Sequence, residues 1–101
     1  MIHVTDDEMN IILNIIEKYA SNCDVLAFGS RYKGTHWKHS DLDLAFSGEK
    51  ELGYLRIAEL KDAFEESDLP YSVDVLDYKA VSPNFRAIID KGNKIIYKNM
   101  M

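Results

Sequence analysis

The stretch from Val25 to Phe46 constrains the fold of this chain more than any other part of it. It begins with the apolar run VLAF, turns at Gly29-Ser30, passes through a basic polar loop and ends in alternating polar and apolar residues. A short continuous apolar run predicts a strand buried on both faces, and strict alternation predicts a strand with one buried face. We therefore expect two strands joined by a polar loop.

Two aspartates open the second of these strands. Asp41 and Asp43 alternate with Leu42, Leu44 and Phe46, so both carboxylates fall on the same side of a strand of period two. Carboxylates placed in this way can hold a divalent cation. A strand start with solvated carboxylates is the alternative for such a pair taken alone.

The other elements follow from capping and periodicity. Thr5 and Glu8 form a capping-box pattern, so a first helix is predicted to begin near Asp6. The remaining predicted elements are a helical turn over 31–33, a helix over 54–66, a strand over 71–77, a helix from Ser82-Pro83 to Gly92 and an edge strand over 95–97. This order predicts an α+β fold, in which helices pack against a small mixed β-sheet.

The first helix carries more apolar surface than one buried face requires. Its predicted core stripe is Met9, Ile12, Leu13, Ile16 and Ala20. Ile11 and Ile15 widen this stripe, so either the helix is well buried or the additional surface contacts a partner. The same periodicity places Tyr54 on the inner face of the second helix, and Phe85 and Ile88 on that of the last.

Length and composition predict one domain, residues 1–101, located in the cytoplasm. With 101 residues of which 47% are hydrophobic, the chain can bury a core but is short of the length at which chains usually split. No apolar run approaches the ~18 residues of a membrane span, and the N-terminus lacks the features of a secretory signal. The one cysteine, Cys23, excludes an internal disulfide.

The charge of the chain disfavours a polynucleotide partner. It has 17 acidic and 12 basic residues and a net charge of −5, whereas sequence-independent binding to a nucleic-acid backbone needs a basic surface. The basic residues Arg31, Lys33 and Lys38, with His36 and His39, nonetheless form a loop without an acid. Such a loop suits a small anion, so we expect no direct nucleic-acid binding.

Asp74, in the strand predicted over 71–77, is a candidate third carboxylate. On neighbouring strands Asp41, Asp43 and Asp74 can meet, and like charges at short distance raise one another's pKa. The cluster is stable as anions only with a cation, and oxygen ligands select hard ions such as Mg²⁺. Two such ions about 3.5–4 Å apart can clamp an in-line displacement at phosphorus.

The Gly29-Ser30 turn adds a phosphate-binding element. Glycine lets main-chain N–H groups approach a phosphate, the helical turn that follows directs positive partial charge at it, and the Ser30 hydroxyl can donate a hydrogen bond. Turn and acids together predict a site for a nucleoside triphosphate and a divalent metal.

The segment GSRYKGTHWKHSDLDLAF resembles the signature of the nucleotidyltransferase superfamily related to polymerase beta. The chain as a whole, from the first helix through VDVLD to the last helix, is similar to the smallest members, the minimal nucleotidyltransferases or MNT proteins. The resemblance implies the polymerase-beta-like fold. It also implies that Asp41, Asp43 and Asp74 are catalytic residues and ligands of two Mg²⁺ ions, with Asp74 the candidate base.

By the same resemblance, Gly29 and Ser30 form the triphosphate cradle and Arg31 and Lys33 contact phosphates. Solvated loop charges are the alternative interpretation of Arg31 and Lys33, which we favour less than phosphate contacts. Nothing in the loop selects a base, so ATP as the substrate is itself implied by the resemblance.

The resemblance further implies a partner. Stand-alone MNT proteins are typically encoded beside HEPN-domain ribonuclease toxins, and the antitoxin transfers AMP from ATP to a tyrosine of the toxin and binds it. A protein adenylyltransferase that forms a hetero-oligomer with a HEPN toxin is therefore implied here. Larger members carry a second domain for the acceptor, for which 101 residues leave no room, so we expect a partner to present the acceptor.

Two alternatives remain open. A non-catalytic antitoxin would neutralise its partner by complex formation, and the additional apolar surface at Ile11 and Ile15 motivates this hypothesis. Nucleotidyl transfer to a small molecule such as an aminoglycoside is the other, and the expected lack of an acceptor domain disfavours it.

Overall fold

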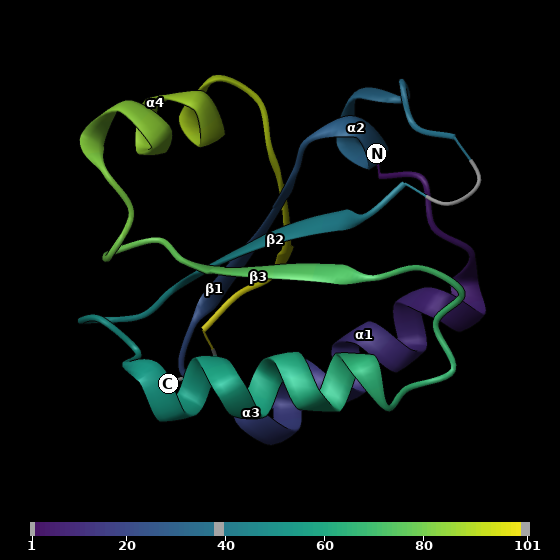
Figure 1. Ribbon diagram of the computed structural model, residues 1–101, viewed down its shortest axis with the longest axis horizontal. Coiled ribbons are helices and arrows are strands. Elements are labelled where there is room, and N and C mark those ends of the chain that lie inside the picture. Colours follow the sequence, from purple (N-terminus) through teal and green to yellow (C-terminus); the bar gives the residue numbers. More distant parts are fainter. Residues whose placement is uncertain (1, 38–39, 100–101) are drawn as a thin grey trace.

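A computed structural model describes residues 2–37 and 40–99, so Lys38 and His39 of the predicted basic loop lie outside the described residues (Figure 1). Its elements are α1 (Asp6–Tyr19), β1 (Asp24–Phe28), α2 (Ser30–Lys33), β2 (Leu42–Ser47), α3 (Tyr54–Glu65), β3 (Val73–Asp77), α4 (Pro83–Lys91) and β4 (Lys94–Tyr97). The predicted α+β fold is confirmed, and the observed elements follow the predicted order.

The strands that the structure describes form a four-stranded mixed sheet in the order β3-β2-β1-β4. β1 is antiparallel to both β2 and β4, whereas β2 and β3 are parallel. A parallel pair needs a long crossover, and α3 supplies it between β2 and β3. The outer strands of the sheet are therefore β3 and β4.

Helices cover both faces of the sheet (Figure 1): α1 and α3 lie on one side, and α4 lies on the other. The main core lies on the side of α1 and α3 and includes Ile12, Ile16, Leu42, Leu44, Phe46, Leu60 and Phe64. A smaller cluster of Phe28, Ala45 and Ile89 lies on the side of α4. β2 is therefore packed on both faces, which leaves little freedom in the register of its residues.

Helix ends follow the predicted caps. The Thr5 hydroxyl accepts a hydrogen bond from the Glu8 N–H at 3.1 Å, and Glu8 Oε1 accepts one from the Thr5 N–H at 3.0 Å. Ser82 caps α4 by accepting a hydrogen bond from the Phe85 N–H at 3.2 Å, with Pro83 in the first helical position.

None of the helices among residues 2–37 and 40–99 has the length and apolar character needed to cross a membrane.

Helical periodicity predicted buried faces that are too wide. Tyr54, at the first position of α3, is 85% exposed, and on α4 Ile88 is 59% and Phe85 37% exposed. Within α4 only Ile89 is buried, because this short helix meets the sheet along a narrow contact. On α1, Ile15 packs against the main core, so part of the additional apolar surface serves the fold itself.

Replacing Phe46, which is fully buried in β2, tests this assignment of the core. We expect Phe46→Ala to lower the free energy of unfolding by about 3–5 kcal/mol, because it leaves a cavity between the sheet and α1 and α3. Urea unfolding followed by circular dichroism measures the loss. Leu55→Ala, at a position on α3 that is 77% exposed, should cost less than about 0.5 kcal/mol. Equal losses in the two variants would contradict the assignment.

Candidate active site

Three adjacent strands place Phe28, Asp43 and Asp74 in one row. Phe28 of β1 is paired with Asp43 of β2, and Asp43 is paired with Asp74 of β3. Residues in register on neighbouring strands project to the same face of a sheet. This is the face on which Phe28 packs with Ile89 of α4. The two carboxylates therefore lie beside an apolar cluster, on the face away from the main core.

The carboxyl groups of Asp43 and Asp74 are in contact. Burial, a hydrogen bond with the Asp74 carboxyl and the negative charges of Asp74 and Asp41 raise the pKa of Asp43 from 3.8 to about 6. Two carboxyl groups can share a hydrogen bond only when one of them carries a proton. Below that pKa a proton therefore holds the pair together, and above it the pair is a site of concentrated negative charge.

Asp41 lies one residue before β2 and is exposed. Its charge reaches Asp43, since it contributes to the raised pKa of that carboxyl. Across the two described segments, however, no three His, Cys, Asp or Glu side chains are gathered closely enough to enclose a metal ion. The structure thus brings Asp43 and Asp74 together and leaves Asp41 at the rim of the pair. A metal site made by all three carboxylates remains a prediction.

Gly29 brings the Gly-Ser turn against these acids. Its backbone has φ 79° and ψ −158°, a conformation that glycine adopts readily and other residues avoid. A Cβ atom at this position would overlap Asp43 Oδ2 and lie 3.0 Å from Asp43 Cγ. Glycine is required here both for the turn and for the space that the carboxylate occupies.

Ser30 and Lys33 belong to the helical turn that follows. α2 runs from Ser30 to Lys33 and ends at Gly34, which is left-handed with φ 80°. The first N–H groups of a helical turn have no acceptor within the turn, so they are open to an anion. Ser30 is half-buried at the start of the turn, and Lys33 is exposed at its end.

Arg31 points into the protein. Its side chain is only 5% exposed. Nε donates to the Ser40 carbonyl at 2.9 Å, a terminal nitrogen donates to the His3 carbonyl at 3.0 Å, and the guanidinium lies 3.8 Å from the centre of the Tyr71 ring. One side chain thus connects the N-terminal segment, the loop before Asp41 and the segment that enters β3. These contacts favour a structural role over the predicted phosphate contact.

Tyr71 and Glu8 complete this anchor, and sequence reasoning missed both. The Tyr71 hydroxyl donates to Glu8 Oε1 at 2.9 Å, and burial together with this bond raises the pKa of Tyr71 above its usual range. Glu8 was interpretable only as a capping residue and Tyr71 only as part of a strand. No local pattern links residues 63 positions apart.

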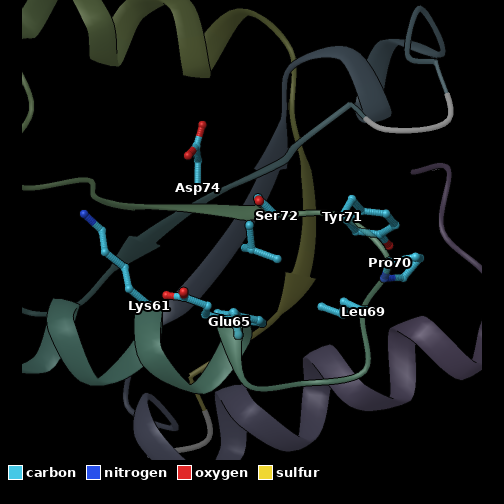
Figure 2. A pocket seen from close by; sticks show the side chains of 9 residues that line it. Lys61, Glu65, Leu69, Pro70, Tyr71, Ser72 and Asp74 are labelled. Atoms are coloured by element: carbon cyan, nitrogen blue, oxygen red, sulfur yellow. The ribbon is translucent and has the colours of Figure 1, made fainter.

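A groove of about 610 Å³ opens beside Asp74 (Figure 2). We call it the α3–β3 groove, and it is lined by Lys61, Phe64, Glu65, Leu69, Pro70, Tyr71, Ser72, Val73 and Asp74. Asp74 projects from β3 away from α3, whereas Glu65 and Lys61 extend from α3 (Figure 2). Local sequence patterns do not predict this groove, because it depends on how α3 packs on β3.

Comparison with known proteins identifies the family. Residues 10–100 match the family described as Polymerase beta, Nucleotidyltransferase. The chain belongs to this family. This nucleotidyltransferase is also 46% identical over 88 residues to the probable protein adenylyltransferase MntA of Haemophilus influenzae, a match that covers 87% of this chain and 77% of the relative. The resemblance inferred from the Gly-Ser turn and the acid pair is confirmed.

Solved structures confirm the fold of this nucleotidyltransferase. A chain in the crystal structure of a toxin-antitoxin with AMP-PNP superposes with a TM-score of 0.77 at 22% identity, covering 91% of this chain and 74% of that one. A chain in the complex of tri-AMPylated Shewanella oneidensis HEPN toxin with MNT antitoxin gives 0.67 at 19% identity, covering 88% and 68%.

Substituting the two neighbouring basic residues Arg31 and Lys33 tests the different roles assigned to them. We expect Arg31→Gln to lower the free energy of unfolding by about 2–4 kcal/mol, because the Ser40 and His3 carbonyl groups lose their charged donor and Tyr71 loses the guanidinium against its ring. Lys33→Gln, at an exposed position of the same turn, should cost less than about 0.5 kcal/mol. Thermal and urea unfolding measure both. Full stability of Arg31→Gln together with weaker nucleotide binding would instead support the phosphate contact.

The raised pKa of Asp43 makes stability depend on pH in metal-free buffer. The carboxyl ionises near 3.8 in the unfolded chain and near 6 in the fold. The unfolded state therefore loses its proton first, and stability falls as the pH rises from about 4 to about 6 and stays lower above. With EDTA at about pH 7.5, Asp43→Asn should be about 1–2 kcal/mol more stable than wild type, a value discounted for solvent screening.

Urea unfolding of both proteins across this pH range tests the sign. The difference should disappear near pH 3, where the carboxyl is protonated in the fold and largely protonated in the unfolded chain. A variant that is less stable than wild type at about pH 7.5 would contradict a raised pKa of Asp43 from burial and neighbouring negative charge.

Proposed function

We propose that this nucleotidyltransferase transfers AMP from ATP to a tyrosine hydroxyl of a HEPN-domain toxin, depends on Mg²⁺, and thereby acts as the antitoxin of that toxin. The observation that carries the proposal is the contact between Asp43 and Asp74 against Gly29, within a chain that is 46% identical to a probable protein adenylyltransferase. The Gly29-Ser30 turn lies against Asp43, and this arrangement supports phosphoryl transfer with a bound metal.

The donor set fits Mg²⁺. Asp41, Asp43 and Asp74 offer only carboxylate oxygens, which hard cations select, and Mg²⁺ in particular is held by one or two carboxylates together with substrate phosphates. Asp43 and Asp74 would hold an ion in place of the shared proton, and Asp41 would join them from the rim. We propose two ions, as the family resemblance implies. When bound, they supply positive charge that neutralises the carboxylates and the triphosphate.

The residues of the chain then act on the substrate as follows. Gly29 and Ser30 bind the triphosphate through main-chain N–H groups and the hydroxyl, and Lys33 at the end of the turn adds a positive charge. The hydroxyl oxygen of the acceptor forms a bond to the α-phosphorus of ATP, and its proton passes to Asp74. The bond between the α-phosphorus and the oxygen bridging to the β-phosphate breaks, and pyrophosphate leaves.

The partner is proposed from the relatives. A similar fold occurs in a toxin-antitoxin structure with AMP-PNP and in an MNT antitoxin bound to a tri-AMPylated HEPN toxin. These ligands and partners belong to those proteins. They support a hetero-oligomer in which the partner presents the acceptor hydroxyl to the Asp43–Asp74 pair.

Transfer of label from α-labelled ATP to the HEPN-domain protein encoded beside this chain tests the proposal. With Mg²⁺ we expect the partner to be labelled, and EDTA to abolish labelling. Asp41→Asn combined with Asp43→Asn should reduce the rate at least about a hundredfold, because the charge that positions metal and phosphate is lost. The fold of this variant should persist, since like-charge repulsion is removed as well.

Asp77→Asn is the matched control. Asp77 ends the same strand as Asp74, and its carboxylate accepts a hydrogen bond from the Leu52 N–H at 2.7 Å, on the side of the loop before α3. An asparagine oxygen can accept the same bond, so this variant should retain transfer. No labelling by wild type, or equal labelling by the double variant, would refute the proposed activity.

A further inference from the structure

β3 is the strand that carries Asp74, and its outer side is open. It is an edge strand, and within residues 2–37 and 40–99 no strand pairs with that side. The Leu42 N–H donates to the Ser72 carbonyl at 2.9 Å, so the main chain of Ser72 and Asp74 faces β2. Alternation along the strand then directs the N–H and C=O groups of Val73 and Val75 outward. Such an edge is a template for a further strand.

The α3–β3 groove lies directly beneath this edge (Figure 2). Phe64 and Leu69 give it an apolar floor, and Lys61 and Glu65 are two exposed charges on its α3 side. In the described part of the chain neither charge forms a salt bridge. The groove thus offers an apolar strip, with one exposed cation and one exposed anion, beside the outer edge of β3.

We propose that an extended segment of the acceptor protein adds to the outer edge of β3 as a further strand and presents its hydroxyl residue opposite Asp74. This inference rests on the proposed transfer to a protein acceptor. Neighbouring strands lie about 4.8 Å apart, and paired residues have Cβ atoms about 5 Å apart on the same face. A residue opposite Asp74 therefore directs its side chain to the face of the acids.

Strand alternation also defines the residues next to the acceptor. The two neighbours of the hydroxyl residue project to the opposite face, which is that of α3, and so point into the α3–β3 groove. There an acidic neighbour complements Lys61 and a basic neighbour complements Glu65. The segment that fits is an extended peptide with a hydroxyl residue between residues of opposite charge.

The other edge and the other class of macromolecule fit less well. β4 is the opposite edge of the sheet, separated from β3 by two strands, and neither Asp43 nor Asp74 lies on it. A polynucleotide would bring phosphates against Glu65 and Asp74 on a chain of net charge −5. A peptide strand instead satisfies the outward main-chain groups of Val73 and Val75.

Amide hydrogen exchange by NMR tests the docking independently of catalysis. In the free protein the Val73 and Val75 amides should exchange rapidly. Adding the HEPN-domain partner, with a non-hydrolysable ATP analogue, should slow exchange at both by about tenfold or more, because each N–H acquires an acceptor. Unchanged exchange at both amides in a formed complex would overturn the proposal.

Val73→Pro tests the edge through transfer. Val73 is the first residue of β3 and its N–H faces outward, so proline removes no hydrogen bond of the sheet. We expect the KM for the acceptor protein to rise about tenfold or more. Binding of a fluorescent ATP analogue with Mn²⁺ should stay unchanged, which also shows that the variant is folded. An unchanged KM in a variant that binds the analogue would count against strand addition.

Charge reversal tests the groove. Lys61→Glu combined with Glu65→Lys should lower kcat/KM for the acceptor about fivefold, mainly through KM, because both complementary contacts become repulsive. Glu17→Lys combined with Lys18→Glu reverses an exposed pair on α1 that does not line the groove, and it should have no effect. Equal effects of the two double variants would overturn the role of the groove.

The outcomes separate this inference from the proposed function. Protection of the two amides without any AMP transfer supports docking and refutes the transfer. Transfer with unprotected amides supports the transfer and refutes docking. Protection by single-stranded RNA but not by the partner protein, or by a higher concentration of this chain alone, would overturn the choice of a protein acceptor as the occupant.

Discussion

The contact between the carboxyl groups of Asp43 and Asp74 is the constraint on which the site depends. Burial, a shared hydrogen bond and the nearby negative charges raise the pKa of Asp43 to about 6, so ionising both carboxyl groups opposes folding. The fold imposes the contact because β2 and β3 are held in register by apolar residues on their other face, among them Leu44 and Val75. Gly29 leaves the space that Asp43 occupies. The packing of the core thus maintains a cluster of negative charge that a cation would relieve.

A second interaction holds the segments around this cluster. Arg31 is buried among main-chain carbonyls and against Tyr71, whose hydroxyl is in turn bound to Glu8. These contacts join the start of the chain and the loop before Asp41 to the entry of β3. A guanidinium suits this position because it presents several donors in one plane and stacks on an aromatic ring. A residue next to the Gly29-Ser30 turn therefore stabilises the segments that carry the acids.

The position of the acids at the edge of the sheet bears on the acceptor. Asp74 lies on an outer strand whose far side pairs with no other strand in the described part of the chain, and the α3–β3 groove lies beneath it. The sheet adds a direction of approach, since an added strand shares the face alternation of β3. In the proposed complex, the strand pairing that binds the partner would therefore also place the acceptor hydroxyl beside Asp74.

Local patterns in the sequence determined the elements and the main candidates for the site. Capping at Thr5 and Ser82, alternation through Leu42 and Leu44, and the Gly29 turn before the acids depend on residues a few positions apart, and so they are readable without a structure. Tertiary structure alone decided the burial of Arg31, the exposure of Tyr54 and Ile88, the pairing of Asp43 with Asp74, the rim position of Asp41 and the groove beside β3. Each of these depends on contacts between segments distant in the chain, such as the 28 positions that separate Arg31 from His3. Periodicity describes which face of an element is apolar, and only packing decides how much of that face is covered.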